Sequence, residues 1–484
     1  MAKTCVNFSK KCGGCPLLAL PYPRQTAEKQ QRLQKLLGGF APVAPLRTMA
    51  EPWHYRNKAI ASFATQQGKL VCGLYAEGTH KVLPSADCLL QNEVLNRTLA
   101  AVQDAARACR YTAFDEDKRT GLLRHVVLRC SRKGQVLVTL VTPGPELPGS
   151  RNFCAALRKK APWVVSIVQN INPTLSSAVL GNREKTLYGP GFVLDTLCGL
   201  QFAISSRSFY QVNPRQTEVL YRAALDAAKL TGKETVVDAY CGIGTIGLCA
   251  APHAGQVIGV ERNPAAVKDA AANARHNKLS NAKFVCADAT EWMAAAADEG
   301  LHPGVVFLDP PRAGSTPECI TAVAKMAPRR VVYVSCDPET LARDVAIFAR
   351  HGYKAKGFTP VDLFPQTRHV ETVVLLSHKK ADSYIHIDVE FGEGEGKIPV
   401  DSIAKRAEAY KPKEKVTYKM IKEYIEAKYG FKVHTAYIAE VKRNLGLPMY
   451  DAPNAVEELK QPRKHPTPEK VEAIKDALRY FAVI

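Results

Sequence analysis

The sequence has no long hydrophobic run. A membrane-spanning helix needs about 20 consecutive residues that are mostly apolar, and no such stretch occurs among the 484 residues. The first residues, Met1 to Cys5, also lack the apolar core of a secretory signal peptide. We therefore expect a cytoplasmic protein with no membrane segment.

Acidic residues are outnumbered by basic ones. The chain has 46 Asp and Glu residues against 66 Lys and Arg residues, which gives a formal net charge of +20. Phosphate groups attract Lys and Arg regardless of base sequence, so an excess of this size favours a nucleic-acid partner. A basic surface that is simply solvated is the alternative interpretation.

Disulfide bonds are not expected, although the chain has 14 cysteines. In a reducing compartment, cysteines serve as metal ligands, reactive thiols or ordinary core residues. Three of them, Cys5, Cys12 and Cys15, lie close together near the N-terminus, and Cys88 follows downstream. These four thiols form a plausible metal site, and the spacing alone fits zinc as well as an iron–sulfur cluster.

The chain is too long for one hydrophobic core, so about two to four domains are expected. Residues 1–50 combine the cysteine segment with a basic helix over residues 24–37, and residues 51–198 mix short strands with turns in an α+β pattern. Residues 199–380 alternate strand and helix, which predicts a Rossmann-like α/β domain with a parallel sheet. Residues 381–484 form a small helical extension that begins with an acidic, glycine-rich linker or hairpin.

The first strands of this α/β domain have the pattern of a nucleotide site. The strand at residues 235–238 runs into glycines at 242 and 244, which let a ligand approach the backbone closely. The second and third strands end in Glu261 and Asp288, whose carboxylates suit ribose and adenine groups. A further glycine at 247 fits NAD equally well, and strand-end capping is the alternative for the acids. A nucleoside-bearing cofactor is predicted.

Reactive groups follow the later strands of the same sheet. The apolar strand at residues 331–334 ends in Ser335 and Cys336, and the strand at residues 305–308 ends in Asp309. Glu371 lies at the start of another strand. Buried strands deliver such side chains to the sheet edge where ligands collect, so a thiol and two carboxylates predict a reactive site. The alternative is that Cys336 is a small core residue.

Five separated motifs resemble those of the RNA (uracil-5-)-methyltransferase family. They are QVNP at 211–214, DAYCGIG at 238–244, DPPRAG at 309–314, SCDP at 335–338 and HVET at 369–372. They occur in that order, and the likeness extends over roughly residues 1–378. The resemblance implies a Rossmann-like methyltransferase sheet and an S-adenosylmethionine-dependent enzyme that methylates C5 of uracil in RNA.

The resemblance also implies roles for individual residues. The Cys336 thiolate attacks C6 of uracil, and Glu371 removes the C5 proton as general base. The residues implied at the S-adenosylmethionine and base site are Gln211, Tyr240, Thr245, Glu261 and Asp309, and the strand pattern adds Asp288 to the cofactor site. The family usually has Phe at the position of Tyr240, and tyrosine keeps the stacking face.

The resemblance favours a [4Fe-4S] cluster over zinc on Cys5, Cys12, Cys15 and Cys88. Family members that modify ribosomal RNA, and some archaeal relatives that act on tRNA, carry a cluster on such cysteines. Many members also begin with a small β-barrel RNA-binding domain that does not precede the cysteines here. We therefore expect 23S ribosomal RNA as the substrate and a monomer with no predicted protein partner.

Other functions remain open at this point. Methylation of uridine 54 in tRNA is the alternative within the same chemistry. RNA cytosine-C5 methylation also uses a cysteine on C6, although the HVET motif argues against it. A non-catalytic RNA-binding protein with a vestigial cofactor fold is the alternative outside catalysis.

Two further segments suggest contacts with RNA. Residues 206–210 precede Gln211 and bring Phe209 to a place suited to a base that has left its stack, with core packing as the alternative for this ring. Helical patterns over residues 417–425 and 437–443, joined by a turn over residues 430–433, suggest a helix-turn-helix-like unit. An appendage that packs on the core is the alternative for this unit.

Overall fold

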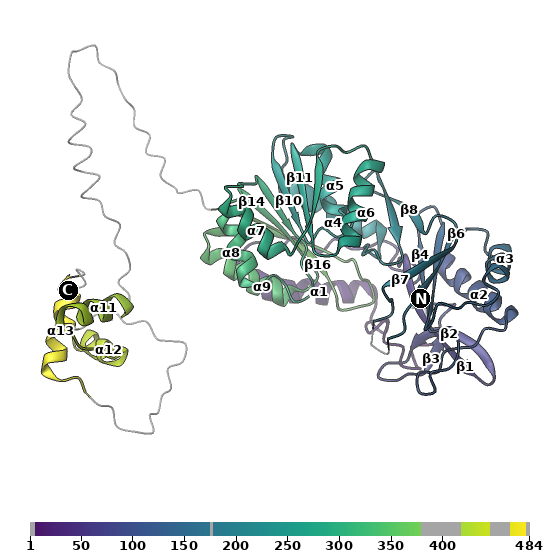
Figure 1. Cartoon of the computed structure of the whole chain (residues 1–484), viewed down its shortest axis with the longest axis horizontal. Coiled ribbons are helices and arrows are strands. Elements are labelled where there is room, and N and C mark those ends of the chain that lie inside the picture. The colour runs from purple at the N-terminus through teal and green to yellow at the C-terminus, as the bar shows by residue number, and fades with distance from the viewer. Residues whose placement is uncertain (1–4, 175–177, 379–417, 446–464, 481–484) are drawn as a thin grey trace, which may run out of the picture. The chain divides into compact units, whose positions relative to one another are not determined.

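The structure is a computed structural model that describes residues 5–174, 178–378, 418–445 and 465–480. The chain divides into two units, Met1–Tyr384 and Ile385–Ile484. The first unit contains two seven-stranded sheets (Figure 1). The predicted linker over residues 381–400 lies outside the described residues.

The N-terminal sheet has the strand order β3-β2-β1-β4-β5-β6-β7. Its strands are β1 (Lys58–Gln66), β2 (Lys69–Tyr75), β3 (Val82–Pro84), β4 (His125–Cys130), β5 (Val136–Thr142), β6 (Val164–Ile171) and β7 (Arg183–Tyr188). Neighbouring strands are antiparallel except β5 and β6, which are parallel. Helices α2 (Glu93–Ala108) and α3 (Ser150–Lys160) share its hydrophobic core, as the predicted α+β pattern requires.

The second sheet has the strand order β12-β11-β10-β13-β14-β16-β15. Its strands are β10 (Thr235–Ala239), β11 (Gln256–Glu261), β12 (Ala282–Cys286), β13 (Val305–Leu308), β14 (Arg330–Ser335), β15 (Tyr353–Val361) and β16 (Glu371–His378). A hairpin of β8 (Phe192–Leu197) and β9 (Leu200–Ser205) precedes it in the chain. The first five strands are parallel, and β16 is antiparallel to both of its neighbours. The predicted Rossmann-like sheet is confirmed.

Strand β10 lies at the switch point of this sheet. The chain moves from β10 outward to β11 and β12 on one side, and then returns to β13 on the other side. Loops that leave β10 and β13 therefore diverge at the carboxyl ends of these strands. In open α/β sheets, ligands bind at this position.

Helices cover both faces of the second sheet. They are α4 (Pro214–Ala228), α5 (Thr245–Ala250) and α6 (Pro264–His276) on one face, and α7 (Ala289–Asp298), α8 (Pro317–Lys325) and α9 (Pro338–Arg350) on the other. Helix α1 (Tyr22–Leu37) joins the second group and lies beside α9 (Figure 1).

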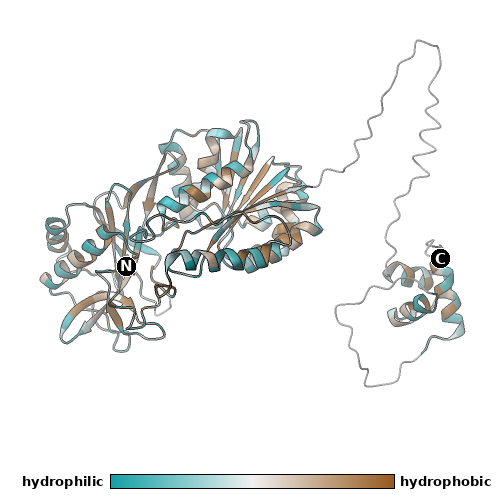
Figure 2. Ribbon diagram, turned by 180° about the vertical axis from the view of Figure 1, so that it is seen from behind, coloured by the Kyte–Doolittle hydropathy of each residue, from teal (hydrophilic) through white to brown (hydrophobic). Residues whose placement is uncertain are grey.

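Helix α1 is hydrophilic along much of its length (Figure 2), and it buries one side, on which Gln25, Lys29, Leu33 and Leu37 recur every four residues. Its Leu33 and Leu37 are fully buried in the same core as Tyr333 of β14 and Phe348 of α9. The helix that follows the cysteine segment is therefore part of the second sheet's domain.

The second unit contains the helices α11 (Tyr418–Tyr429), α12 (Thr435–Asn444) and α13 (Pro468–Tyr480). The buried apolar side chains of its core include Ile421, Ile425, Val433, Ile438, Val441, Ile474 and Leu478. The two predicted helices and the turn between them are confirmed. Across the described ranges, no helix is both long enough and apolar enough to cross a membrane.

Candidate active site

A tight glycine loop joins β10 to α5. Tyr240, Gly242 and Gly244 have φ angles of 64°, 56° and 81°, so three residues of this short loop adopt the left-handed conformation that favours glycine. A Cβ atom added at Gly242 would meet no atom within 4 Å, which shows open space in front of the backbone. The loop can therefore approach a ligand closely at the switch point.

Glu261 connects this loop to the end of the next strand. Its Oε2 accepts a hydrogen bond from the backbone N–H of Gly242 at 3.2 Å, and its Oε1 accepts one from Asn263 at 2.8 Å. Asp288 caps α7, because its Oδ1 accepts from the backbone N–H of Thr290 at 2.9 Å. Asp288 is thus a helix cap in this structure, as the alternative interpretation of this residue expects. Glu261 and Asp288 nevertheless lie at the ends of two adjacent strands, β11 and β12.

Side chains from α4 and α8 orient two of the predicted cofactor residues. The Tyr240 hydroxyl donates to the Cys319 sulfur at 3.3 Å, and the Thr245 hydroxyl bonds the Tyr221 hydroxyl at 2.8 Å. Sequence reasoning missed Tyr221, because its position among the apolar residues of α4 resembles ordinary core packing.

The loop before Gln211 is held from the N-terminal sheet. Asn57 donates to the backbone oxygen of Gln211 at 3.2 Å, and the buried Arg129 guanidinium donates to the backbone oxygen of Ser208. Phe209 is 70% exposed, so core packing is wrong for this ring. An exposed aromatic side chain thus stands two residues from Gln211.

Strand register brings Cys336 and Glu371 together. Strands β14 and β16 are antiparallel, and Ser335 pairs with Thr372. Cys336 directly follows Ser335, and Glu371 directly precedes Thr372, so both residues lie at the same end of the paired strands. Cys336 is half-buried and Glu371 is buried, so one partially accessible thiol faces one enclosed carboxyl group at the sheet edge.

Burial and neighbouring charges raise the pKa values of the groups at this edge. Burial, followed by the nearby Glu371 and Asp309, raises the pKa of Cys336 to about 11, while Arg312 opposes the shift. Burial and Asp309 raise the pKa of Glu371 to about 8, again against Arg312. Burial also raises the pKa of Asp309 to about 7. Asp309 acts on both Glu371 and Cys336, and Glu371 acts on Cys336, so the three groups lie close together.

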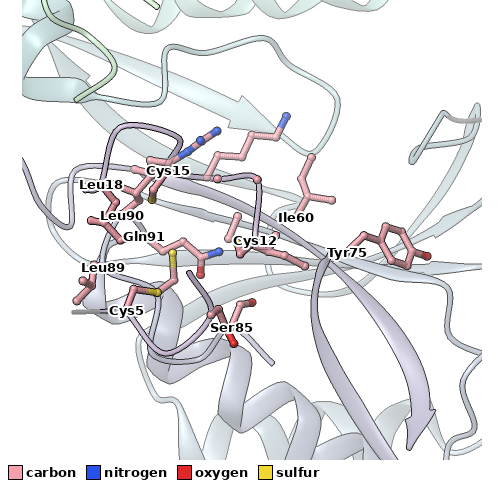
Figure 3. A pocket seen from close by; sticks show the side chains of 18 of the residues that line it. Cys5, Cys12, Cys15, Leu18, Ile60, Tyr75, Ser85, Leu89, Leu90 and Gln91 are labelled. Carbon is pink, nitrogen blue, oxygen red and sulfur yellow. The ribbon is translucent and has the colours of Figure 1, made fainter. Parts of the chain in front are cut away.

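The predicted metal ligands also lie together, in a different place. Cys5, Cys12, Cys15 and Cys88 line one cavity of about 580 Å³, and Figure 3 shows three of them around it. Burial, and then the other three thiols, raise the pKa of Cys15 to about 12. Val212 of the QVNP motif lines the same cavity.

Among the described residues, no group of three or more Cys, His, Asp or Glu side chains has the geometry to hold a metal ion. The four thiols are soft donors that line one cavity, and thiolates of this kind would hold zinc or an iron–sulfur cluster.

Comparison with known proteins identifies the family. The tRNA (uracil-5-)-methyltransferase family model matches residues 199–379. An uncharacterized RNA methyltransferase of Halalkalibacterium halodurans is 42% identical over 381 residues, which cover 78% of this chain and 83% of the relative. The chain belongs to the RNA (uracil-5-)-methyltransferase family. It is therefore related to enzymes along most of the first unit.

Two further similar proteins support this family assignment. An uncharacterized RNA methyltransferase of Enterococcus faecalis is 41% identical over 377 residues, covering 77% of this chain and 82% of the relative. The crystal structure of Pyrococcus abyssi tRNA (uracil-54, C5)-methyltransferase in complex with S-adenosyl-L-homocysteine is similar, with a TM-score of 0.64 and 26% identity. The match covers 75% of this chain and 85% of that structure.

The proximity of Cys336 and Glu371 makes a prediction about thiol reactivity. Because the Glu371 carboxylate helps raise the pKa of Cys336, the variant Glu371→Gln should lower that pKa and speed alkylation of Cys336 at pH 8 to 9. Site-resolved mass spectrometry after iodoacetamide treatment measures the rate. Glu318→Gln, on α8, is the control and should leave the rate unchanged. An unchanged rate in Glu371→Gln would contradict the proximity of the two groups.

Proposed function

We propose that this protein transfers a methyl group from S-adenosylmethionine to C5 of a uracil in RNA through a covalent Cys336 intermediate. The observation that supports this most is the pairing of β14 with β16, because it brings Cys336 and Glu371 to one sheet edge, where Glu371 and Asp309 both act on the thiol. The cofactor loop after β10 opens at the switch point of the same sheet. Family membership supplies the substrate atom.

The chemistry requires these residue types. C5 of uracil is a weak nucleophile, and addition of the Cys336 thiolate to C6 makes C5 an enolate-like carbon that can accept a methyl group. The C5 proton must then leave before Cys336 is eliminated, and Glu371 is the base in this proposal. Its pKa of about 8 lies near neutrality, where a general base works best.

Four residues would hold the cofactor: Tyr240, Thr245, Glu261 and Asp288. Gln211 and Asp309 would bind the uracil and the methionine part. S-adenosylmethionine supplies the methyl group and a positive sulfonium charge, which lowers the cost of ionising Cys336 among carboxylates. The exposed Phe209 ring suits a base that has left its stack.

Ribosomal RNA is the substrate that we propose, following the resemblance to family members that carry such N-terminal cysteines. The tRNA descriptions of the family model and of the Pyrococcus abyssi structure make tRNA the second candidate. Both substrates imply an enzyme that works in the cytoplasm.

RNA that contains 5-fluorouridine tests the function, because fluorine at C5 blocks the elimination step. With S-adenosylmethionine, the protein should form a covalent adduct with fluorinated ribosomal RNA that survives denaturation. The adduct should disappear in Cys336→Ala and persist in Cys286→Ala, which changes an exposed cysteine. An adduct with tRNA alone would favour the second candidate. No adduct with either RNA would contradict the proposal.

For the cysteine cavity, we propose a [4Fe-4S] cluster on Cys5, Cys12, Cys15 and Cys88, with zinc as the alternative. The support is the convergence of four thiols on one cavity and the mutual effect of the thiols on the pKa of Cys15. Methyl transfer needs no redox step. The cluster would therefore order the N-terminal segment and not take part in the reaction.

Metal analysis of anaerobically purified protein tests this site. We expect iron and acid-labile sulfide in equal amounts, and loss of both in Cys15→Ser and Cys88→Ser but not in Cys286→Ser. Zinc without sulfide would favour the alternative. Wild-type protein with neither metal would contradict a metal site.

We also propose that the C-terminal unit contacts RNA through α12. Val441 and Ile438 of this helix face the core, whereas Arg443 is exposed and Lys442 is partly exposed. Reversing both charges (Lys442→Glu with Arg443→Glu) should weaken RNA binding and reduce its salt dependence by about two phosphate contacts. Filter binding at several salt concentrations measures this, with Arg479→Glu on α13 as control. The proposal would be contradicted if RNA affinity were unchanged both in the Lys442→Glu/Arg443→Glu variant and after deletion of residues 385–484.

A further inference from the structure

The loop over residues 362–370 delivers Glu371 to the active-site edge. It joins β15 to β16, and several of its side chains are buried, including Asp362, Gln366 and Val370. Gln366 has a φ angle of 68°, a left-handed conformation that a glutamine seldom adopts. Such a conformation persists where the surroundings hold it in place.

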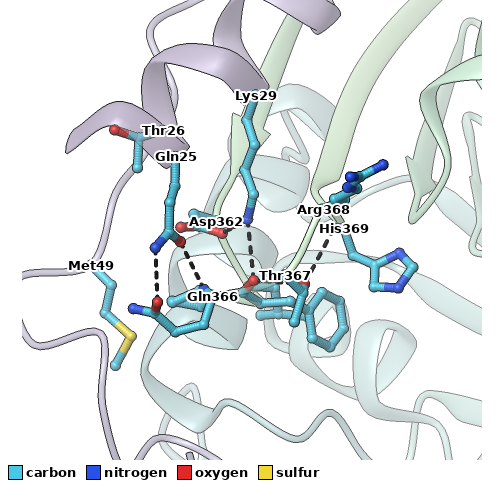
Figure 4. Close-up of polar contacts among 12 residues, drawn as sticks. Gln25, Thr26, Lys29, Met49, Asp362, Gln366, Thr367, Arg368 and His369 are labelled. Atoms are coloured by element: carbon cyan, nitrogen blue, oxygen red, sulfur yellow. Dashed lines mark hydrogen bonds and ion pairs between the residues drawn. The ribbon is translucent and has the colours of Figure 1, made fainter. Parts of the chain in front are cut away.

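Helix α1 holds the start of this loop through a buried ion pair. The Lys29 Nζ lies 2.6 Å from Asp362 Oδ1 and donates to the backbone oxygen of Phe364 at 3.1 Å (Figure 4). The Tyr22 hydroxyl donates to Asp362 Oδ2 at 2.8 Å. Both carboxylate oxygens of Asp362 are thus bound by α1.

Helix α1 also holds the middle of the loop through a pair of glutamines. Gln25 Nε2 donates to Gln366 Oε1 at 2.8 Å, and the backbone N–H of Gln366 donates to Gln25 Oε1 at 3.0 Å. Figure 4 shows these two side chains facing each other. The two-way contact restrains both the side chain and the backbone of the strained residue.

The cysteine segment is bonded to the same point. The backbone N–H of Leu17, two residues after Cys15, donates to the backbone oxygen of Gln366 at 3.1 Å. Gln25 Nε2 donates back to the Leu17 oxygen at 3.0 Å. Leu17, Gln25 and Gln366 therefore form one buried network that links the cysteine segment to the loop before Glu371.

The ion pair is costly to bury. Side-chain exposure is 4% for Lys29 and 0% for Asp362, and burial lowers the pKa of Lys29 while Asp362 opposes the shift. Desolvation of two charges offsets most of their attraction, so such a pair adds little net stability but breaking it leaves an uncompensated charge. The main effect of this ion pair is therefore to fix the position of loop 362–370 against α1, and not to stabilise the fold.

We propose that Lys29 and Gln25 are positioning residues that hold loop 362–370 so that Glu371 stands opposite Cys336, and that they tie this placement to the cysteine segment. The role of Glu371 in this inference rests on the proposed function. The placement itself rests on the contacts of the loop.

Two variants separate positioning from stability. Lys29→Met should reduce kcat about 10- to 100-fold, with the KM for S-adenosylmethionine nearly unchanged, because Lys29 binds Asp362 and Phe364 of the loop before Glu371. The double variant Lys29→Met with Asp362→Asn removes both buried charges, so its Tm should recover towards wild type. Its kcat should stay low, since the Lys29 ammonium that binds both Asp362 and the backbone oxygen of Phe364 is still missing.

The titration of Cys336 gives a readout that does not depend on RNA. The charged groups that act on this thiol are Glu371, Asp309 and Arg312. Displacement of Glu371 removes one negative charge, so the midpoint pH for alkylation of Cys336 should fall in both Lys29 variants. Phe153→Leu, in the core of the N-terminal sheet, is the control for lost stability. At temperatures where this variant is folded, Cys336 should be alkylated with the wild-type midpoint pH.

Specific results with these variants would contradict the positioning role or the tie to the cysteine segment. Recovery of kcat together with Tm in the double variant, or a wild-type Cys336 midpoint in Lys29→Met, would show that the pair is merely structural. Cys15→Ser should lower the midpoint in the same direction as Lys29→Met, whereas Cys286→Ser should not. A wild-type midpoint in Cys15→Ser would overturn the tie to the cysteine segment. If wild-type protein formed no 5-methyluridine, the proposed function would fail, but the alkylation results would still decide the positioning.

Discussion

The antiparallel insertion of β16 beside β14 is the constraint on which the site depends. Parallel strands bring only their carboxyl ends to the ligand-binding edge, whereas an antiparallel strand begins there. Cys336 follows the end of β14 and Glu371 is the first residue of β16, so the pairing of Ser335 with Thr372 brings them together. A shift of one residue would turn the Glu371 side chain to the other face of the sheet.

This arrangement concentrates carboxyl groups in a poorly solvated place. Burial raises the pKa of Asp309 to about 7 and that of Glu371 to about 8, and both groups disfavour ionisation of Cys336. Arg312 opposes these shifts for Cys336 and Glu371. The resting site therefore favours a protonated thiol, and a bound cation shifts the balance towards the thiolate. In the proposed function, that cation is the sulfonium group of S-adenosylmethionine.

The sequence predicts the strands and the glycine loop well, because each depends on a local pattern. The apolar run at residues 331–334 predicts β14. The cysteine spacing predicts a four-thiol metal site; the four cysteines line one cavity, and the metal itself stays a prediction. Contacts over long separations leave no local signal: Lys29 and Asp362 are 333 residues apart, and the packing of α1 on the second sheet is equally remote. Exposure of Phe209 depends on which neighbours cover it, so only the folded chain excludes core packing.

Release of the C5 hydrogen tests the central claim most directly, because it separates the two residues. RNA carrying tritium at C5 of uracil would be incubated with S-adenosylmethionine and each variant. Wild-type protein should release tritium in step with methyl transfer, and Cys336→Ala should do neither. Glu371→Gln should transfer the methyl group and remain bound to RNA while releasing about 100-fold less tritium. Wild-type tritium release by Glu371→Gln, or methyl transfer by Cys336→Ala, would contradict the account.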